Sequence, residues 1–130
     1  MRLPLIYVAH PYGGNPSNLD RADLWLERLT RWSGEKALYW APWIQLCRMC
    51  PDVGETRERG LEIDQACVEM SDGMLMVGGC VSPGMSSERI VARSVLDLSA
   101  LTGPEQLLQS LSPCGDLLAW VDVLTKGSNR

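Results

Sequence analysis

The feature that most constrains the fold of this chain is a pair of short apolar runs, each of which stops at a loop rich in glycine. Residues 3–9 form the first run and residues 72–78 the second, and each is followed by a segment with the amphipathic spacing of a helix. Both runs are too short for a buried helix, so we interpret them as buried strands. Strands that alternate with helices are typical of a parallel sheet with helices on both faces. The pattern therefore predicts an α/β fold with a mainly parallel sheet of about four or five strands.

The other expected elements complete a single-domain three-layer sandwich of Rossmann-like or flavodoxin-like architecture. The first helix is expected to have Ser17 as its N-cap and to stop at residues 33–34. Ligands of such sheets bind beyond the carboxyl ends of the strands, so the loops that follow the strands should share one crevice. Residues 41–54 fit no clear pattern. Further strands are expected at residues 37–40 and 94–98, and further helices at 55–70, from near Gly84, at 104–111 and at 116–124.

The length of 130 residues fits one domain, which we place at residues 1–125, with a flexible tail at residues 126–130. The net charge of −4 argues against a nucleic acid polymer as partner, because neutralising phosphates needs a basic surface. No apolar run approaches the ~18 residues of a membrane span, and the apolar N-terminal stretch is too short for a signal peptide. We therefore expect a cytoplasmic protein with no membrane partner.

The five cysteines, an odd number, are expected to be reduced thiols in that compartment. Cys47 and Cys50 form a C-x-x-C pair, a spacing found in zinc and redox sites. A zinc site needs a second pair or a nearby histidine, and the single histidine, His10, is distant in sequence. We therefore favour small core residues over a zinc or redox role. We expect neither a metal nor a cofactor.

Two carboxylates fall where apolar side chains belong. Asp64 lies in the middle of the apolar arc of the helix at residues 55–70, which is formed by Leu61, Ile63, Cys67 and Val68. Glu88 lies on the apolar side of the next helix, among Met85, Val91, Ala92, Val95 and Leu96. An unpaired buried carboxylate costs several kcal/mol. Each could pair with a buried arginine or cap a backbone. Two of them, on consecutive helices beside the expected crevice, indicate a functional pair instead.

The start of the helix that carries Glu88 has the composition of an anion site. The positive end of a helix dipole favours negative charge, so we expect Glu88 to be held ionised, which suits a nucleophile. Gly84 and the three hydroxyls of Ser82, Ser86 and Ser87 in the same segment offer a close backbone approach and hydrogen-bond donors to an anionic group. Ordinary helix capping would explain one of these serines but hardly all of them.

Taken together, these residues resemble the nucleoside 2-deoxyribosyltransferase-like family. That family includes 2-deoxynucleoside 5′-monophosphate N-glycosidases and small bacterial and phage proteins without an assigned function. The resemblance covers roughly residues 3–98. It is carried by Ile6-Tyr7-Val8-Ala9 before a glycine-containing loop, by Ser82-x-Gly84-x-x-x-Glu88, and by Asp64 eight residues before Asp72.

The resemblance implies cleavage of an N-glycosidic bond by a retaining mechanism with two carboxylates. Glu88 would attack the anomeric carbon of a 2-deoxyribosyl group, and Asp64 would protonate or orient the departing base. Tyr7 would act beside Glu88. Water as the acceptor makes such a protein a hydrolase, and a second base makes it a transferase. The resemblance also implies a homodimer or higher homo-oligomer, because family members close their sites with residues of a neighbouring subunit.

The chain departs from the family pattern in the residues that would read the substrate. Ser82 stands where the transferases carry an acidic residue and resembles the branch that hydrolyses nucleoside 5′-monophosphates, whereas Ser86 replaces a glycine common in that branch. The partner implied is a small-molecule nucleoside or nucleotide. We expect Gly13, Gly14, Ser82 and Ser86 to surround a phosphate, and the full set of substrate-binding residues adds His10, Tyr12 and Gly84.

Other residues near the expected crevice have plainer interpretations. Trp40 and Trp43 could stack on a base, but packing is the preferred role. Asp72 is expected to cap a loop or begin its strand. Arg57 and Arg59 are expected at a solvated helix start, from which either could reach a phosphate.

The main alternative function is a catalytically inactive nucleotide-binding or sensing module. The presence of both inward carboxylates argues against it, because they hinder phosphate binding. A phosphoribohydrolase-like Rossmann protein would carry a fuller glycine run than Gly84 supplies, and nothing marks the flavin site of a flavodoxin-like electron carrier.

Overall fold

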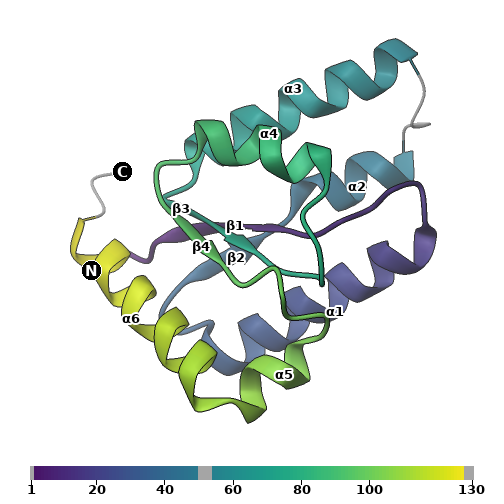
Figure 1. The fold of residues 1–130 in the computed structure, drawn as a ribbon. Coiled ribbons are helices and arrows are strands. Elements are labelled where there is room, and N and C mark those ends of the chain that lie inside the picture. The colour runs from purple at the N-terminus through teal and green to yellow at the C-terminus, as the bar shows by residue number, and fades with distance from the viewer. Residues whose placement is uncertain (1, 50–53, 128–130) are drawn as a thin grey trace.

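The chain forms a four-stranded parallel sheet with the strand order β2-β1-β3-β4. The strands are β1 (Leu5–Ala9), β2 (Leu38–Trp40), β3 (Gly73–Met76) and β4 (Val95–Asp97). The structure is a computed structural model that describes residues 2–49 and 54–127, without the side chains of residues 54–57 and 112. The sheet confirms the predicted parallel α/β fold of Rossmann-like or flavodoxin-like architecture (Figure 1).

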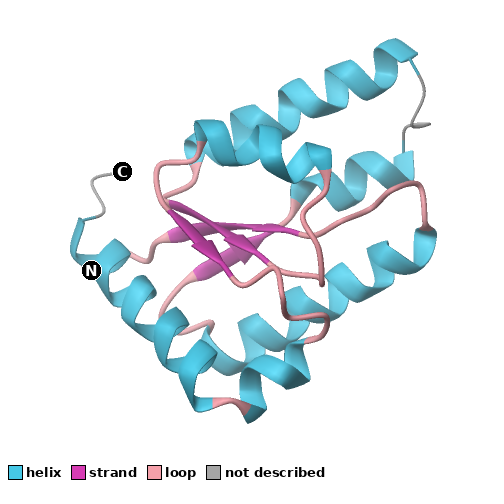
Figure 2. Cartoon of the chain, in the orientation of Figure 1, coloured by secondary structure: helices cyan, strands magenta, loops and turns pink. Residues whose placement is uncertain are grey.

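Helices cover both faces of this sheet. They are α1 (Pro16–Ser33), α2 (Pro42–Met49), α3 (Gly54–Met70), α4 (Pro83–Val91), α5 (Pro104–Gln109) and α6 (Leu111–Gly127). One layer contains α1, α5 and α6, and the other contains α2, α3 and α4, as the two cyan layers of Figure 2 show. The predicted three layers are therefore present.

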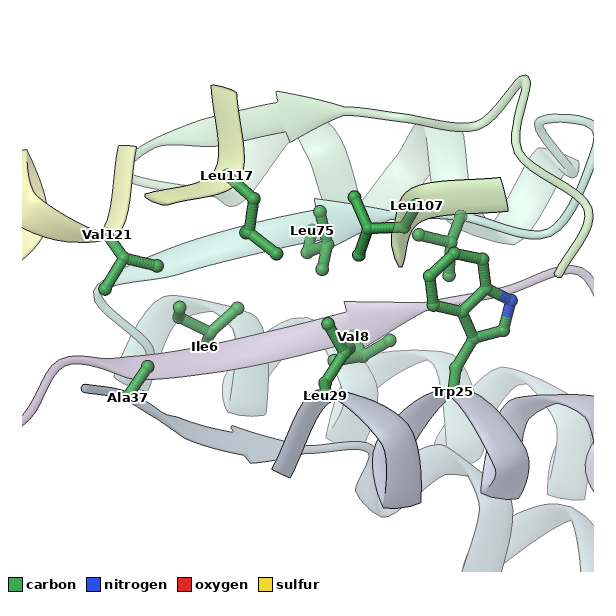
Figure 3. Close-up of a cluster of buried hydrophobic side chains, with 10 residues drawn as sticks. Ile6, Val8, Trp25, Leu29, Ala37, Leu75, Leu107, Leu117 and Val121 are labelled. Carbon is green, nitrogen blue, oxygen red and sulfur yellow. The ribbon is translucent and has the colours of Figure 1, made fainter. Parts of the chain in front are cut away.

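Strand alternation builds the core on the side of α1, α5 and α6. Ile6 and Val8 of β1 and Leu75 of β3 point to this side, because successive residues of a strand point to opposite faces. The helices cover these strand residues with a continuous apolar surface (Figure 3). The helical side chains of this cluster are Trp25, Leu29, Leu107, Leu117 and Val121.

The opposite face of the same two strands is also closed to water. Tyr7 and Ala9 of β1 and Met74 and Met76 of β3 point toward α2, α3 and α4, and none is more than 1% exposed. A polar group that reaches this face therefore lies in a medium of low dielectric constant, where its charged form is disfavoured.

Helix α2 occupies most of the segment that the sequence left without a pattern. In the parallel register Leu38 N–H donates to the Pro4 carbonyl, so the N–H of residue 42 would donate to the Val8 carbonyl. Pro42 has no N–H, and the strand stops there. The indole Nε1 of Trp43 donates to the Val8 carbonyl instead, at 2.9 Å. This bond completes the sheet edge and ties α2 to β1.

Three expected boundaries are corrected by the structure. Helix α1 begins at Pro16 with Asn15 as its N-cap, whose side chain accepts from Ser17 N–H, so the expectation that Ser17 caps the helix is wrong. Val95 and Leu96 belong to β4 rather than to the helix of Glu88. Helix α6 runs to Gly127, so the first two residues of the expected tail are helical, and residues 128–130 lie outside the described residues.

Candidate functional site

The strand order places the expected crevice between β1 and β3. From β1 the chain first goes to β2 on one side and then returns to β3 on the other, so the direction of winding reverses between these two strands. Ligands of open parallel sheets bind at this switch point, outside the carboxyl ends of the strands. The loops that follow β1, β3 and β4 gather at this end of the sheet, shown in pink in Figure 2.

Tyr7, Asp64 and Glu88 come together on the face covered by α3 and α4. Tyr7 is fixed in the central strand β1, Asp64 projects from α3, and Glu88 projects from the second turn of α4. Tyr7 is 0% and Glu88 7% exposed, whereas Asp64 is half-buried. The charges of both carboxyl groups act on the Tyr7 hydroxyl, so the three groups form one electrostatic cluster.

Burial changes the protonation of the two carboxyl groups. The pKa of Glu88 is raised to about 7, chiefly because burial disfavours the carboxylate; the nearby Tyr7 hydroxyl opposes the increase and the charge of Asp64 adds to it. Burial also raises the pKa of Asp64 to about 7. The expectation that the helix start holds Glu88 ionised is therefore wrong, because with a pKa of about 7 Glu88 is only partly ionised at neutral pH. Glu88 lies beyond the first turn, where the dipole is weaker than the cost of burial.

Each member of this cluster keeps a polar atom without a partner. Tyr7 Oη, Asp64 Oδ1 and Glu88 Oε2 are buried and make no hydrogen bond to any described residue. Tyr7 and Glu88 influence each other's pKa, although neither Tyr7 Oη nor Glu88 Oε2 has a hydrogen-bond partner among the described residues. Burial, and then the charges of Glu88 and Asp64, raise the pKa of Tyr7 well above its usual value, so the phenol stays protonated. The cluster thus holds one donor beside two unsatisfied acceptors.

Cys67 is a fourth member that the sequence analysis did not assign to the site. It lies three residues after Asp64 on α3, and the pKa of its thiol is raised by burial and by the charges of Asp64 and Glu88. Its thiol therefore remains protonated at neutral pH. The spacing in the sequence could have indicated this position, because residues three apart lie on the same face of a helix. Cys67 fitted the apolar arc of that helix equally well, so its spacing from Asp64 did not single it out.

The loop before α4 is a helix cap in the structure. Ser82 is the N-cap of α4, and its Oγ accepts from Met85 N–H at 3.2 Å. Ser86 is exposed, and a Cβ at Gly84 would make ordinary contact with Leu61 at 3.7 Å. Capping thus occupies one lone pair of Ser82 and leaves its O–H proton available, while Ser86 faces solvent.

The loop after β1 makes a tight turn at the same end of the sheet. Gly13 and Gly14 have φ values of 58° and 75°, and Asn15 N–H donates to the Tyr12 carbonyl across them at 3.1 Å. This is the pattern of a turn that favours glycine at both central positions. Both glycines are exposed. Tyr12 is half-buried and packs against the apolar residues between the sheet and the layer of α2, α3 and α4.

Neither Asp64 nor Glu88 affects the pKa of His10, so His10 lies outside their electrostatic cluster. It follows β1, is 4% exposed, and its Nδ1 lies 2.8 Å from the Pro11 carbonyl oxygen. Its Nε2 is buried without a partner among the described residues. The pKa of His10 is lowered by burial and by the positive charge of Arg21 on α1, against the effect of the Pro11 carbonyl. Arg21 is a cation near the crevice that the sequence analysis missed, because it lies outside both loops.

The residues with plainer interpretations are structural. Asp72 lies before β3, at the opposite end of the sheet from the loops, where Leu5 N–H donates to its Oδ2 at 2.7 Å. Asp72 thus precedes β3, which begins at Gly73, and its carboxylate caps the first N–H of β1. Trp40 Nε1 donates to Ser71 Oγ at 2.9 Å, and Trp43 is 5% exposed, so both indoles serve packing.

In the described part of the chain no three His, Cys, Asp or Glu residues are grouped to hold a metal ion. Cys50 lies outside the described residues, so the structure does not test the C-x-x-C pair that it forms with Cys47. The side chain of Arg57 lies outside the described part of the chain as well. Arg59 is exposed on α3. Among residues 2–49 and 54–127, no helix is both long and apolar enough to cross a membrane.

Comparison with other proteins adds no family assignment: no model of a known protein family and no curated protein matches this sequence.

Proposed function

We propose that this protein cleaves the N-glycosidic bond of a 2-deoxynucleoside or nucleoside 5′-monophosphate, with Glu88 as the nucleophile. The observation that supports this proposal is the buried cluster of Tyr7, Asp64 and Glu88, in which two carboxyl groups of raised pKa lie together on the face of the sheet covered by α3 and α4. Ion pairs would account for buried carboxylates in a structural role, but no described lysine or arginine forms an ion pair with Asp64 or Glu88. Such groups cluster where acid, base or nucleophile chemistry occurs.

The proposed reaction has two steps. A Glu88 carboxylate oxygen bonds to the anomeric carbon, and the C–N bond breaks with its electron pair leaving on the base. The Asp64 carboxyl supplies the proton that the departing base takes up. In the second step water, or another base, attacks the same carbon and releases Glu88, with Asp64 accepting the proton.

The pKa values near 7 suit this division of roles. At neutral pH a large share of molecules holds one proton on the pair, so one carboxyl can be ionised while its neighbour is protonated. Tyr7, whose phenol stays protonated, can donate a hydrogen bond to the carboxylate of Glu88 once a substrate aligns them. Tyr7 thereby favours the ionised form of Glu88 at the moment it is needed.

The proposal also covers the cellular location and the oligomeric state of the protein. We infer a cytoplasmic homodimer or larger homo-oligomer of the nucleoside 2-deoxyribosyltransferase-like kind. The second candidate function, a nucleotide-binding or sensing module without catalysis, would be favoured by nucleotide binding without turnover. Analytical ultracentrifugation of the active protein tests the assembly, and an active monomer would contradict it.

The decisive experiment incubates the protein with the four 2-deoxynucleosides and their 5′-monophosphates, with and without a free acceptor base, and quantifies released base by chromatography. Glu88→Gln and Asp64→Asn keep the size of each side chain and should abolish or greatly reduce base release. Glu62→Gln, at an exposed carboxylate on the same helix as Asp64, is the matched control and should be fully active. Full activity in Glu88→Gln would exclude the nucleophile assignment.

A trapping experiment identifies the covalent step directly. The probe is a deoxynucleoside that carries fluorine on the 2′-carbon of its sugar. This fluorine slows the release of the sugar from the protein more than the transfer of the sugar to the carboxylate. Mass spectrometry of the digested protein should then find the added sugar on the peptide that contains Glu88. A label on another residue would assign the nucleophile elsewhere.

A further inference from the structure

His10 is held in one tautomer by its neighbour. Its Nδ1 lies 2.8 Å from the carbonyl oxygen of Pro11, and a carbonyl oxygen can only accept a hydrogen bond. The proton of the neutral ring therefore resides on Nδ1. Nε2 is left as a lone pair, so it can accept a hydrogen bond but has none to donate.

That lone pair has no donor in the described structure. Nε2 is buried, and the whole residue is 4% exposed. Burial and the positive charge of Arg21 lower the pKa of His10, which keeps Nε2 unprotonated at neutral pH. A buried acceptor without a partner is costly and rare in folded proteins, so its retention calls for a donor that arrives with a ligand.

His10 lies where a ligand of this fold is expected. It ends β1 at the switch point, and its ring packs against Gly78, just after β3. A Cβ on Gly78 would come within 2.9 Å of His10 Nε2 and 2.5 Å of Pro11 Cδ. Gly78 has a φ of 112° and Gly79 one of 94°, a backbone conformation reserved largely for glycine. The two strand ends therefore meet at the imidazole, which packs so closely on Gly78 that no larger residue fits there.

We propose that His10 determines substrate specificity by accepting, through Nε2, a hydrogen bond from the free 5′-hydroxyl of the sugar, so that unphosphorylated nucleosides are preferred over their 5′-monophosphates. This inference rests on the proposed function. A phosphate dianion offers only acceptor oxygens and would face the lone pair of Nε2 with another lone pair. A nucleoside presents its free 5′-hydroxyl as a donor at that position, whereas the 3′-hydroxyl and the base N–H groups are common to both classes and would not separate them.

The chain makes this inference directly observable, because His10 is its only histidine. Nitrogen-15 NMR of the imidazole therefore needs no assignment between residues. The full-length Glu88→Gln protein is titrated with each deoxynucleoside, each 5′-monophosphate and inorganic phosphate, so that no substrate is consumed. In the free protein Nδ1 should carry the proton. At least one deoxynucleoside should shift Nε2 in the direction of hydrogen-bond acceptance, and inorganic phosphate should leave it unchanged.

Two results would overturn the inference. Protonation of Nε2 by phosphate or a monophosphate would mean that His10 binds an anion as an imidazolium. A Nε2 signal that no probe moves would mean that His10 does not contact the ligand.

Kinetics separate this inference from the proposed function. The wild-type protein should release base with a higher kcat/KM from nucleosides than from monophosphates. His10→Leu, which lacks an acceptor, should lower kcat/KM for nucleosides about tenfold and leave the monophosphates nearly unchanged, whereas His10→Gln should retain most of the preference. Faster release from monophosphates would refute the specificity inference alone. No release from any substrate would refute the proposed function, and the NMR titration would still decide the role of His10.

Discussion

Glu88 should make the protein less stable at alkaline pH, and replacing it should recover that stability. Its pKa is about 7 in the folded state against 4.5 for an ordinary glutamate, so the folded protein holds the proton more tightly than the unfolded chain. Stability therefore falls as pH rises from about 4.5 to about 7 and stays low above that range. The shift corresponds to about 3 kcal/mol at pH 8.5 and about 1 kcal/mol at pH 5.

The perturbation is Glu88→Gln, which keeps the shape of the side chain and removes its charge. The amide can donate to the unpartnered oxygens of Asp64 and Tyr7, so the substitution does not leave its own donors unsatisfied. We expect urea denaturation to give a free energy of unfolding that exceeds that of the wild type by up to about 3 kcal/mol at pH 8.5, with a smaller gain of about 1 kcal/mol at pH 5.

The pH dependence of the gain is the critical result. Glu62→Gln, on the surface of α3, controls for the loss of a negative charge at a site where burial plays no part. A gain that is equal at pH 5 and pH 8.5 would show that the ionisation of Glu88 does not cause it. A loss of stability at pH 8.5 would refute the view that Glu88 is held in a low-dielectric environment without an ion-pair partner.

Three further predictions concern the site and the sheet. Base release should follow a bell-shaped pH profile centred near pH 7, because the reaction needs Glu88 ionised and Asp64 protonated and both pKa values are about 7; a profile flat from pH 5 to 9 would contradict this assignment. Asp72→Ala should cost about 1–3 kcal/mol in urea denaturation, since it leaves Leu5 N–H without its acceptor, but kcat/KM should not change, and a selective loss of kcat would reassign Asp72 to the reaction. Gly73→Ala should cost about 1–3 kcal/mol and alter tryptophan fluorescence, because its Cβ would lie 2.5 Å from the Trp120 ring. Gly60→Ala, which meets nothing within 4 Å, should be neutral or stabilising, and equal effects of the two substitutions would refute the packing explanation.

The sheet and its helices could be predicted from the sequence because their signals are local and consistent. The runs that became β1 and β3 are short and apolar, and the helices between strands follow the helical period. Helix α2 could not be predicted, because Pro42 and the short length of the segment hide its period. Its position depends on the bond from Trp43 to Val8, a contact between residues far apart in the chain.

The carboxylate pair was predictable for a different reason. Asp64 and Glu88 each interrupt the apolar face of a helix, and such an interruption can be recognised from the helical spacing of residues in the sequence. Their protonation was not, because the helix dipole and burial act in opposite directions on Glu88, and the sequence does not state how completely a side chain is covered. Arg21 was missed for a related reason: its approach to His10 depends on where α1 passes the end of β1.

The edges of the sheet restrict how copies of this chain can associate. Both edge strands, β2 and β4, are only three residues long, and β2 is cut off by Pro42. On β4 the edge carries Asp97, whose carboxylate accepts from Ser99 N–H and pairs with Arg89. Short, charged and proline-terminated edges give a neighbouring strand little backbone to pair with. Continuous β-sheets between subunits are thereby disfavoured, so any assembly of this protein has to be built from contacts between its helices and loops.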